Sequence, residues 1–112
     1  MSQYENQPCI DACTRCAEEC EHCAIACLNG PDVAKMAACI RLDNDCAAVC
    51  RLAATFLIQR SSFDAEVGRL CAAVCLSCET ECSKHNLDQC QRCAEACRRC
   101  ADECNRMAGA IS

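Results

Sequence analysis

The sequence predicts an all-α protein, an antiparallel up-down four-helix bundle with a cysteine-lined core. The main observation is that 18 of the 112 residues are cysteine, and that most of them recur at alternating steps of three and four residues. This is the spacing of the inward stripe on a helix in a bundle. Short breaks separate the helical stretches, so successive helices should run antiparallel. No stretch alternates with a period of two, so no strand is expected.

The helices are expected at 8–28, 32–60, 62–84 and 87–107, within a single domain that spans residues 1–112. Pro8 suits the first turn of the first helix, and Asn-Gly-Pro at 29–31 breaks that helix. Ser61 followed by Asp64 resembles a capping box at the start of the third helix. Gly109 is expected to end the fourth helix.

Extending the alternating steps places all 18 cysteines on the inward stripes. In antiparallel order, one end of the bundle should then collect Cys27, Met36, Cys39, Cys82, His85 and Cys90. The opposite end should collect Cys9, Leu57, Cys104 and Met107, with Phe56 and Phe63 nearby. We expect Ala53, Leu57 and the two phenylalanines to form a hydrophobic plug at this second end.

The composition limits the classes of function. Leu, Ile, Val and Phe together make up 18 residues, about 16%, so cysteine must serve as a core residue or the fold must be held by metal or oligomerisation. The net charge of −5, without a basic run, argues against nucleic acid and membrane partners. The start of the chain does not resemble a signal peptide. An unprocessed chain is therefore expected to be cytoplasmic, where thiols stay reduced.

The cysteine spacing suits Cu(I). Cβ atoms four residues apart on a helix lie about 5–6 Å apart, which is too far for a good disulfide but allows two sulfurs to grip one ion. Cu(I) is a soft ion that thiolate and thioether ligands select. The predicted cargo is multiple Cu(I) ions, roughly one per cysteine. The predicted ligands are Cys9, Cys13, Cys16, Cys20, Cys23, Cys27, Cys39, Cys46, Cys50, Cys71, Cys75, Cys78, Cys82, Cys90, Cys93, Cys97, Cys100 and Cys104, with Met36, Asp43, His85 and Met107 as additional candidates.

Charge also favours Cu(I) over zinc. A Cu(I) ion that replaces a thiol proton leaves the local charge unchanged, whereas Zn²⁺ with four thiolates carries −2. Three alternatives stay open: a zinc protein, an iron–sulfur electron carrier and a thiol redox buffer. No cysteine–histidine–acid set or glycine-rich loop supports catalysis, so the protein is not expected to be an enzyme.

Four residues have a competing structural interpretation. Asp43 is either a ligand or a residue at the edge of its stripe, paired with Arg41 or the neighbours of Lys35. His85 is either a ligand or a capping or surface residue, and Met36 and Met107 are either ligands or core fillers.

The sequence resembles the bacterial copper storage proteins, specifically the cytosolic branch without a signal peptide. The resemblance rests on the Cys-x3-Cys-x2-Cys ladders, on the segment from Cys39 to Cys46, and on Glu-Cys-Ser-Lys-His at 81–85 leading to Cys90 and Cys93. It implies a four-helix bundle that binds many Cu(I) ions and assembles as a homotetramer. It also implies loading through one end, placed here at Met36, Cys39, Asp43, His85 and Cys90. A copper chaperone that donates or accepts the ions is a further candidate partner, which the resemblance does not identify.

Overall fold

The computed structural model describes residues 6–111, and the side chains of residues 6–109. Residues 1–5, on which the expectation of an absent signal peptide partly rests, lie outside this range. The elements are α1 (Gln7–Leu28), the 3-10 helix η1 (Val33–Met36), α2 (Ala37–Gln59), α3 (Asp64–Cys82) and α4 (Asp88–Ile111). Residues 6–111 contain no strand, and the predicted all-α class is confirmed.

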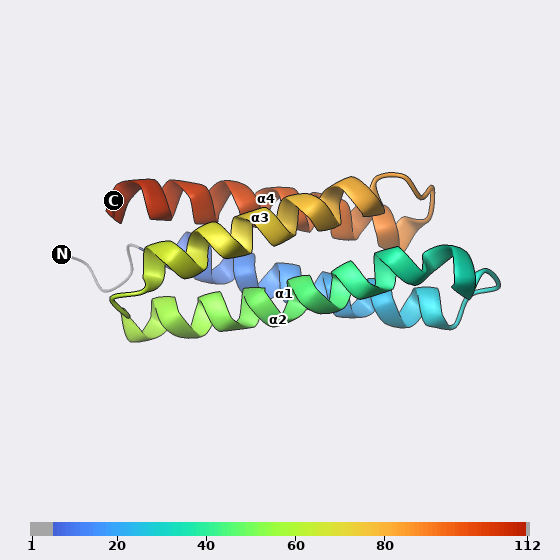
Figure 1. Ribbon diagram of the computed structural model, residues 1–112, viewed down its shortest axis with the longest axis horizontal. Helices are drawn as coiled ribbons and strands as arrows, with labels where there is room; N and C mark the ends of the chain where they lie inside the picture. Colours follow the sequence, from blue (N-terminus) through green and yellow to red (C-terminus); the bar gives the residue numbers. More distant parts are fainter. Residues whose placement is uncertain (1–5, 112) are drawn as a thin grey trace.

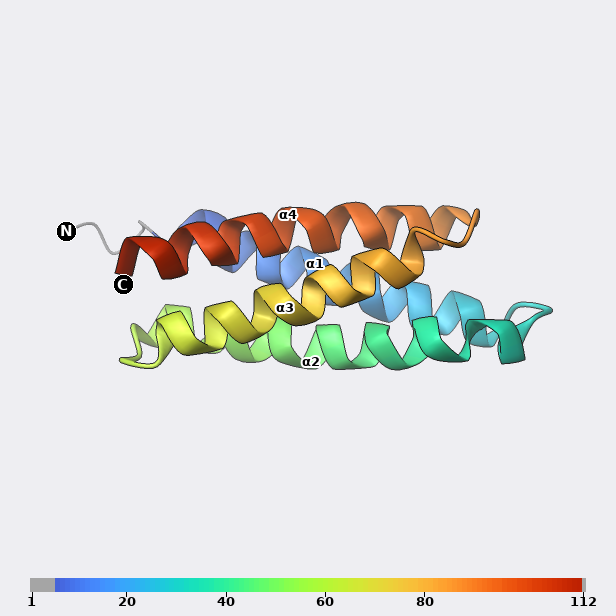
Figure 2. The same cartoon turned by 45° about the horizontal axis from the view of Figure 1, so that its top comes forward.

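The four helices form an elongated antiparallel bundle with extents of 50 × 18 × 18 Å (Figure 1). α1 packs against α2 and α4, and α3 packs against the same two helices, which closes the ring. The α1–α2 and α3–α4 connections lie together at one end, and the start of α1, the end of α4 and the α2–α3 turn lie at the other (Figures 1 and 2). We call these the loop end and the terminal end. Among the described helices, none is both long and apolar enough to span a membrane.

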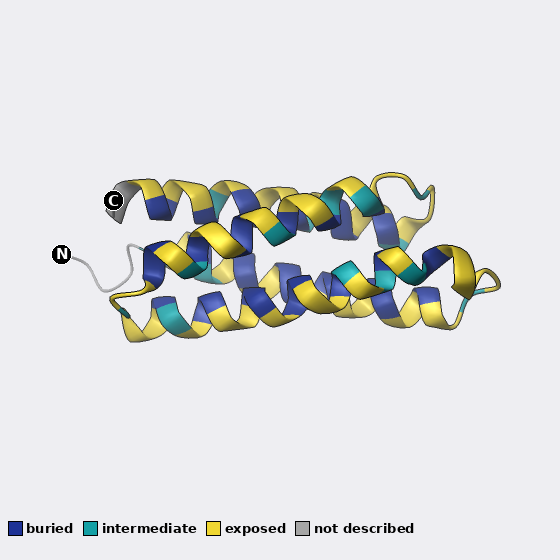
Figure 3. Ribbon diagram, in the orientation of Figure 1, coloured by how far each residue is buried: buried dark blue, intermediate teal, exposed yellow. Residues whose placement is uncertain are grey.

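The inward stripes are buried as the cysteine spacing predicts. All 18 cysteines are at most 3% exposed, and the buried positions follow the inner face of each helix (Figure 3). Small alanines lie beside the cysteines in the interior, including Ala17, Ala72 and Ala101. Because alanine and cysteine are both small, the core consists mainly of sulfur and methyl groups rather than of large aliphatic side chains.

Both ends of α2 differ from a simple α-helix. The segment predicted to begin the helix at residue 32 is the 3-10 turn η1, in which Lys35 N donates to Asp32 O at 3.0 Å. Such tight turns are common where a helix starts. At the other end, Arg60 adopts φ 57°, and Ser61 N donates to Phe56 O at 3.0 Å. This is a Schellman-type ending, which closes α2 at Gln59.

The third helix is shorter than predicted at both ends. The Ser61 hydroxyl accepts a hydrogen bond from Phe63 N at 3.1 Å, not from Asp64 N as a capping box requires, and α3 begins at Asp64. At its other end, Lys84 N donates to Glu81 O, so the chain leaves α3 in a tighter turn after Cys82.

The fourth helix extends beyond its predicted end. Gly109 lies inside α4, which continues to Ile111. A glycine in a helix costs only about 1 kcal/mol relative to alanine, so it does not by itself stop a helix whose preceding turn is packed. Met107 and Ala108, in that turn, are buried.

At the terminal end, the structure modifies the predicted plug. Leu57 and Ala53 are each 2% exposed, as expected, but Phe63 is 60% exposed and does not cover the core. Gly68 instead lets α3 approach Met107, because a Cβ atom at Gly68 would lie 2.5 Å from Met107 Cε. Met107 is therefore packed against α3 and closes this end of the sulfur core.

Candidate metal centre

The eighteen thiols are all free and buried within residues 6–111. In seven of the eight Cys-x3-Cys pairs, the two Sγ atoms lie 3.9–4.0 Å apart. A disulfide would need about 2.05 Å. The pairs therefore stand as separate thiols that face the same space, and a soft ion between them could bind both.

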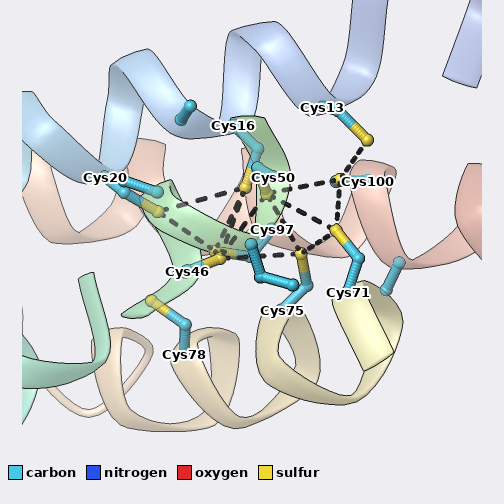
Figure 4. Close-up of a cluster of buried hydrophobic side chains, with 14 of the residues drawn as sticks. Cys13, Cys16, Cys20, Cys46, Cys50, Cys71, Cys75, Cys78, Cys97 and Cys100 are labelled. Atoms are coloured by element: carbon cyan, nitrogen blue, oxygen red, sulfur yellow. Dashed lines mark hydrogen bonds between the residues drawn. The ribbon is translucent and has the colours of Figure 1, made fainter. Parts of the chain in front are cut away.

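Contacts between helices join these pairs into a ladder. In the middle of the bundle, Cys46 Sγ lies 3.7 Å from Cys16 Sγ on α1, 3.6 Å from Cys75 Sγ on α3 and 3.9 Å from Cys97 Sγ on α4 (Figure 4). All four helices thus contribute sulfur at one level of the axis. No single helix could provide such a site.

Several groups of four cysteines have all four Sγ atoms within 4.8 Å of one another. Cys16 and Cys46 each belong to at least two of these groups, as do Cys20 and Cys97. Shared ligands favour thiolates that bridge neighbouring ions over a row of independent sites. Four of the groups nevertheless have no member in common: Cys13/Cys71/Cys100/Cys104, Cys16/Cys46/Cys50/Cys75, Cys20/Cys78/Cys93/Cys97 and Cys23/Cys27/Cys39/Cys90.

Sγ–Sγ hydrogen bonds of 4.0 Å or less group the cysteines into two networks, which approach each other to within 4.8 Å where Cys78 faces Cys93. The larger network reaches from the terminal end to the middle of the bundle and contains Cys9, Cys13, Cys16, Cys20, Cys46, Cys50, Cys71, Cys75, Cys93, Cys97, Cys100 and Cys104. The smaller network lies at the loop end and contains Cys23, Cys27, Cys39, Cys78, Cys82 and Cys90.

Asp43 forms hydrogen bonds with members of both networks at the level where they meet. Its Oδ1 atom accepts hydrogen bonds from Cys93 Sγ at 3.2 Å in the larger network and from Cys78 Sγ at 3.3 Å in the smaller one. Cys82 and Cys39 also donate to its carboxyl group, at 3.6 and 3.8 Å. The side chain is fully buried, so the interpretation of Asp43 as an edge residue paired with basic neighbours is wrong. The helical repeat of α2 stays in register at this position, which keeps Asp43 on the inner stripe. Its role as a ligand stays a prediction.

Burial controls the ionisation of this carboxyl group. Removal from water, followed by the nearby charge of Cys93, raises the pKa of Asp43 to about 8. A protonated carboxyl group needs no counter-ion, which explains how Asp43 can lie among thiols with no basic residue on the inner stripes.

Contacts among the thiols set which of them ionise first. Hydrogen bonds, the largest of them to Cys16, hold the pKa of the Cys46 thiol far below its usual range. At the loop end, hydrogen bonds led by the one to Cys23 lower the pKa of Cys39 to about 3, whereas burial raises the pKa of Cys90 to about 12. Because the thiolate is the form that binds metal, neighbouring thiols that stabilise a thiolate make it easier for an incoming ion to displace a thiol proton.

The non-cysteine candidates lie where the antiparallel order predicts. Met36 is 5% exposed at the loop end, and Met107 is 6% exposed at the terminal end. His85 is half-buried at the loop end, and its Nε2 lies 2.9 Å from Glu81 Oε2. The structure brings Met36 and His85 to one cavity together with Cys27. Metal ligation by these side chains stays a prediction.

One buried charged group escaped the sequence analysis. Glu19 is 7% exposed and pairs with Arg15 at 3.2 Å and with Arg92 at 3.8 Å, across the α1–α4 contact. From the sequence alone, Glu19 belongs to an outward face beside Cys20. Its burial depends on Arg92, which comes from a helix more than 70 residues away in the chain. The group is structural in character, since it links two helices outside the sulfur ladder.

The fold and the site define a helical bundle whose core is lined with buried thiols, grouped so that they could hold metal ions. A family model described as "Csp: Copper storage protein" matches residues 2–109. The chain therefore belongs to the copper storage protein family, and the resemblance noted in the sequence is confirmed.

Solved structures and a curated relative agree with this assignment. The Cu(I)-bound copper storage protein BsCsp3 is 42% identical with a TM-score of 0.89, and the match covers 96% of this chain and 99% of that one. A cytosolic copper storage protein from Streptomyces lividans, solved during copper loading with five coppers, is 39% identical with a TM-score of 0.91, over 96% of this chain and 94% of that one. The cysteine-rich protein YhjQ of Bacillus subtilis is 44% identical over 85% of this chain and 87% of its own length.

Proposed function

We propose that the protein stores Cu(I) in its thiol ladder, at roughly one ion per cysteine. The observation that carries this proposal is the ladder of buried thiols, which runs from Cys9 at one end of the bundle to Cys90 at the other. An ion that enters at either position would find thiolate ligands at every level of the axis. The solved relatives named above contain Cu(I) or several coppers, which supports the same cargo here.

Charge supports a high copper capacity. Each Cu(I) ion that displaces a thiol proton keeps the core neutral, so filling one site does not oppose filling the next. The basic side chains of the ion pairs lie outside the ladder; Arg51, for example, binds Glu21 on the bundle surface. Storage on this scale needs no charge compensation from them.

A zinc protein is the second candidate, because the four non-overlapping cysteine groups have the ligand number that structural Zn²⁺ prefers. Four such sites would use 16 of the 18 cysteines, since four groups of four ligands make 16. Each site would carry −2 in a core without cations, which is unfavourable at low dielectric. We therefore place Cu(I) first.

The remaining features of the proposal follow the family. We infer a cytosolic store, as in the Streptomyces lividans relative, without enzymatic activity. We also infer a homotetramer, which would cover exposed apolar side chains such as Ile58, Phe63 and Leu70. We also propose a copper chaperone, as donor or acceptor of the ions, as a further partner.

The metal content of the protein tests the proposal. The chain should be produced in cells grown with added copper and purified without oxygen, and copper, zinc, iron and acid-labile sulfide should then be measured. We expect more than about ten copper ions per chain and less than about one zinc ion. Four zinc ions per chain would support the zinc protein, and iron with labile sulfide would support an electron carrier. Little metal with reversible disulfides would support a redox buffer.

A further inference from the structure

A cavity of about 370 Å³ opens at the loop end of the bundle. Its walls come from three segments: the end of α1 with the following loop, the 3-10 helix η1, and the α3–α4 connection, which meet at the same end of the molecule in Figure 1. The volume falls within the range of about 300–1,000 Å³ that is typical of small-molecule sites. It is a concave space, not a flat face of the kind that binds a folded protein.

The cavity reaches the last thiols of the ladder. Cys27 is among its lining residues and is 2% exposed. The Cys27 Sγ atom lies 3.9 Å from Cys90 Sγ and accepts a hydrogen bond from Gln89 Nε2 at 3.8 Å. A ligand in the cavity would therefore lie directly beside the first thiols available for copper transfer.

Both lysines of the chain lie at this cavity. Among the 11 basic residues of the sequence, Lys35 and Lys84 are the only lysines, and both line this cavity. No arginine lines it. Lys84 Nζ lies 3.4 Å from Glu81 Oε1, and the other oxygen of Glu81 contacts His85, so this cation is partly neutralised. Asp32 also lines the cavity, whereas Lys35 forms no ion pair with any described residue.

We propose that this cavity binds the anionic, low-molecular-weight thiol that carries Cu(I) to the protein. This inference rests on the proposed storage function and names the donor class. The lysines suit carboxylate groups on the carrier, because an ammonium on a flexible stem can follow an anion that enters in more than one pose. In an acidic protein, two lysines at the mouth also offset the repulsion that an anionic donor would meet elsewhere on the surface.

The transfer itself is a ligand exchange without oxidation or reduction. The bond between Cu(I) and the carrier sulfur breaks, and a bond between Cu(I) and Cys27 Sγ forms. The proton of the Cys27 thiol passes to the released carrier thiolate, so charge and electrons balance. Cys90, at 3.9 Å, then provides the second sulfur and draws the ion into the ladder.

Loading kinetics with two thiol donors test the proposal. Reduced, copper-free protein is mixed without oxygen with Cu(I) complexed either by glutathione, which is anionic, or by cysteamine, which carries no carboxylate. The test variant is Lys35→Gln with Lys84→Gln, which keeps most of each side chain and removes its charge. The matched control is Arg69→Gln with Arg106→Gln, which removes two charges from exposed positions near the terminal end.

The lysine variant should load three- to tenfold more slowly than wild type from the glutathione complex, since each exposed ion pair contributes modestly. With the cysteamine complex, the rate should change less than about twofold, and added salt should reduce the difference between the proteins. Unchanged loading from glutathione would overturn the proposal. Equal slowing with both donors, or in the arginine control, would overturn it as well, because the effect would then not be specific to an anion in this cavity.

The final copper content of the same samples separates this proposal from the storage function. If every variant fills to the same high capacity, the storage function is supported. The loading rates alone then test whether the cavity is the donor site. A capacity of only a few ions in wild type would contradict storage, and the donor proposal would fail with it.

Discussion

Replacement of Cys46 with serine should remove at least two Cu(I) ions from the capacity of the protein. Cys46 Sγ lies within 4.0 Å of sulfurs from all three other helices, and it belongs to at least two of the four-cysteine groups. A thiolate in this position would bridge neighbouring ions, and a serine hydroxyl is a poor ligand for a soft ion. The loss should be measured by anaerobic titration with Cu(I) against a chromophoric chelator.

Cys9 provides the matched control for this experiment. It lies at the terminal end of the ladder, where its Sγ contacts Cys104 Sγ at 3.7 Å. Replacement of Cys9 with serine should therefore remove about one ion. Circular dichroism should confirm that both variants keep their helices, because a buried hydroxyl can cost about 1–3 kcal/mol if it lacks a partner. Equal losses from the two variants would contradict a core in which central thiolates are shared.

Replacement of Asp43 with asparagine should stabilise the copper-free protein in alkaline solution. Burial raises the pKa of this carboxyl group to about 8, whereas the unfolded chain ionises near the ordinary value of about 3.9. Between these values the folded protein holds a proton that the unfolded chain has released. The free energy of unfolding of wild type therefore falls as the pH rises through this window.

Asparagine cannot ionise and keeps an oxygen for the hydrogen bonds from Cys93 and Cys78. At about pH 8.5 the free energy of unfolding of Asp43→Asn should exceed that of wild type by roughly 2–4 kcal/mol, and near pH 4 the two should agree within about 1 kcal/mol. Urea denaturation of the reduced proteins measures the difference. Asp45→Asn, at an exposed position on the same helix, is the control and should show no such pH dependence. A constant difference for Asp43→Asn across this range would disprove the burial argument.

The sequence predicts the fold and the identity of the ladder because both depend on one local regularity. Cysteines at steps of three and four specify which face of each helix is buried, and short connections specify antiparallel neighbours. From these two facts, the contact of Cys27 with Cys90 at the loop end and that of Cys9 with Cys104 at the terminal end follow without any knowledge of side-chain geometry.

Features that depend on contacts between helices could not be predicted in this way. The hydrogen bonds of Asp43 depend on the rotamers of Cys78 and Cys93 from two other helices. The burial of Glu19 depends on Arg92 of α4. The position of Lys35 depends on the 3-10 turn η1, which sequence patterns do not distinguish from the first turn of an α-helix.

The cysteine pattern also does not predict where the helices end, because hydrogen bonds at the helix ends decide this. Arg60 takes the left-handed conformation that glycine usually provides, while Gly109 stays helical. In both cases the packing of the preceding turn outweighs local residue preference. Leu57 and Met107, each buried at the terminal end, anchor those turns.

The most direct test of the central claim is the Cu(I) capacity of the fully reduced wild-type protein. Cu(I) should be added stepwise without oxygen in the presence of a chromophoric Cu(I) chelator, and the point at which the chelator begins to bind copper should be recorded. We expect this point near one ion per cysteine, at about 18 ions per chain. Saturation at four ions or fewer, or copper that the chelator takes from the start, would contradict a thiol ladder that stores copper.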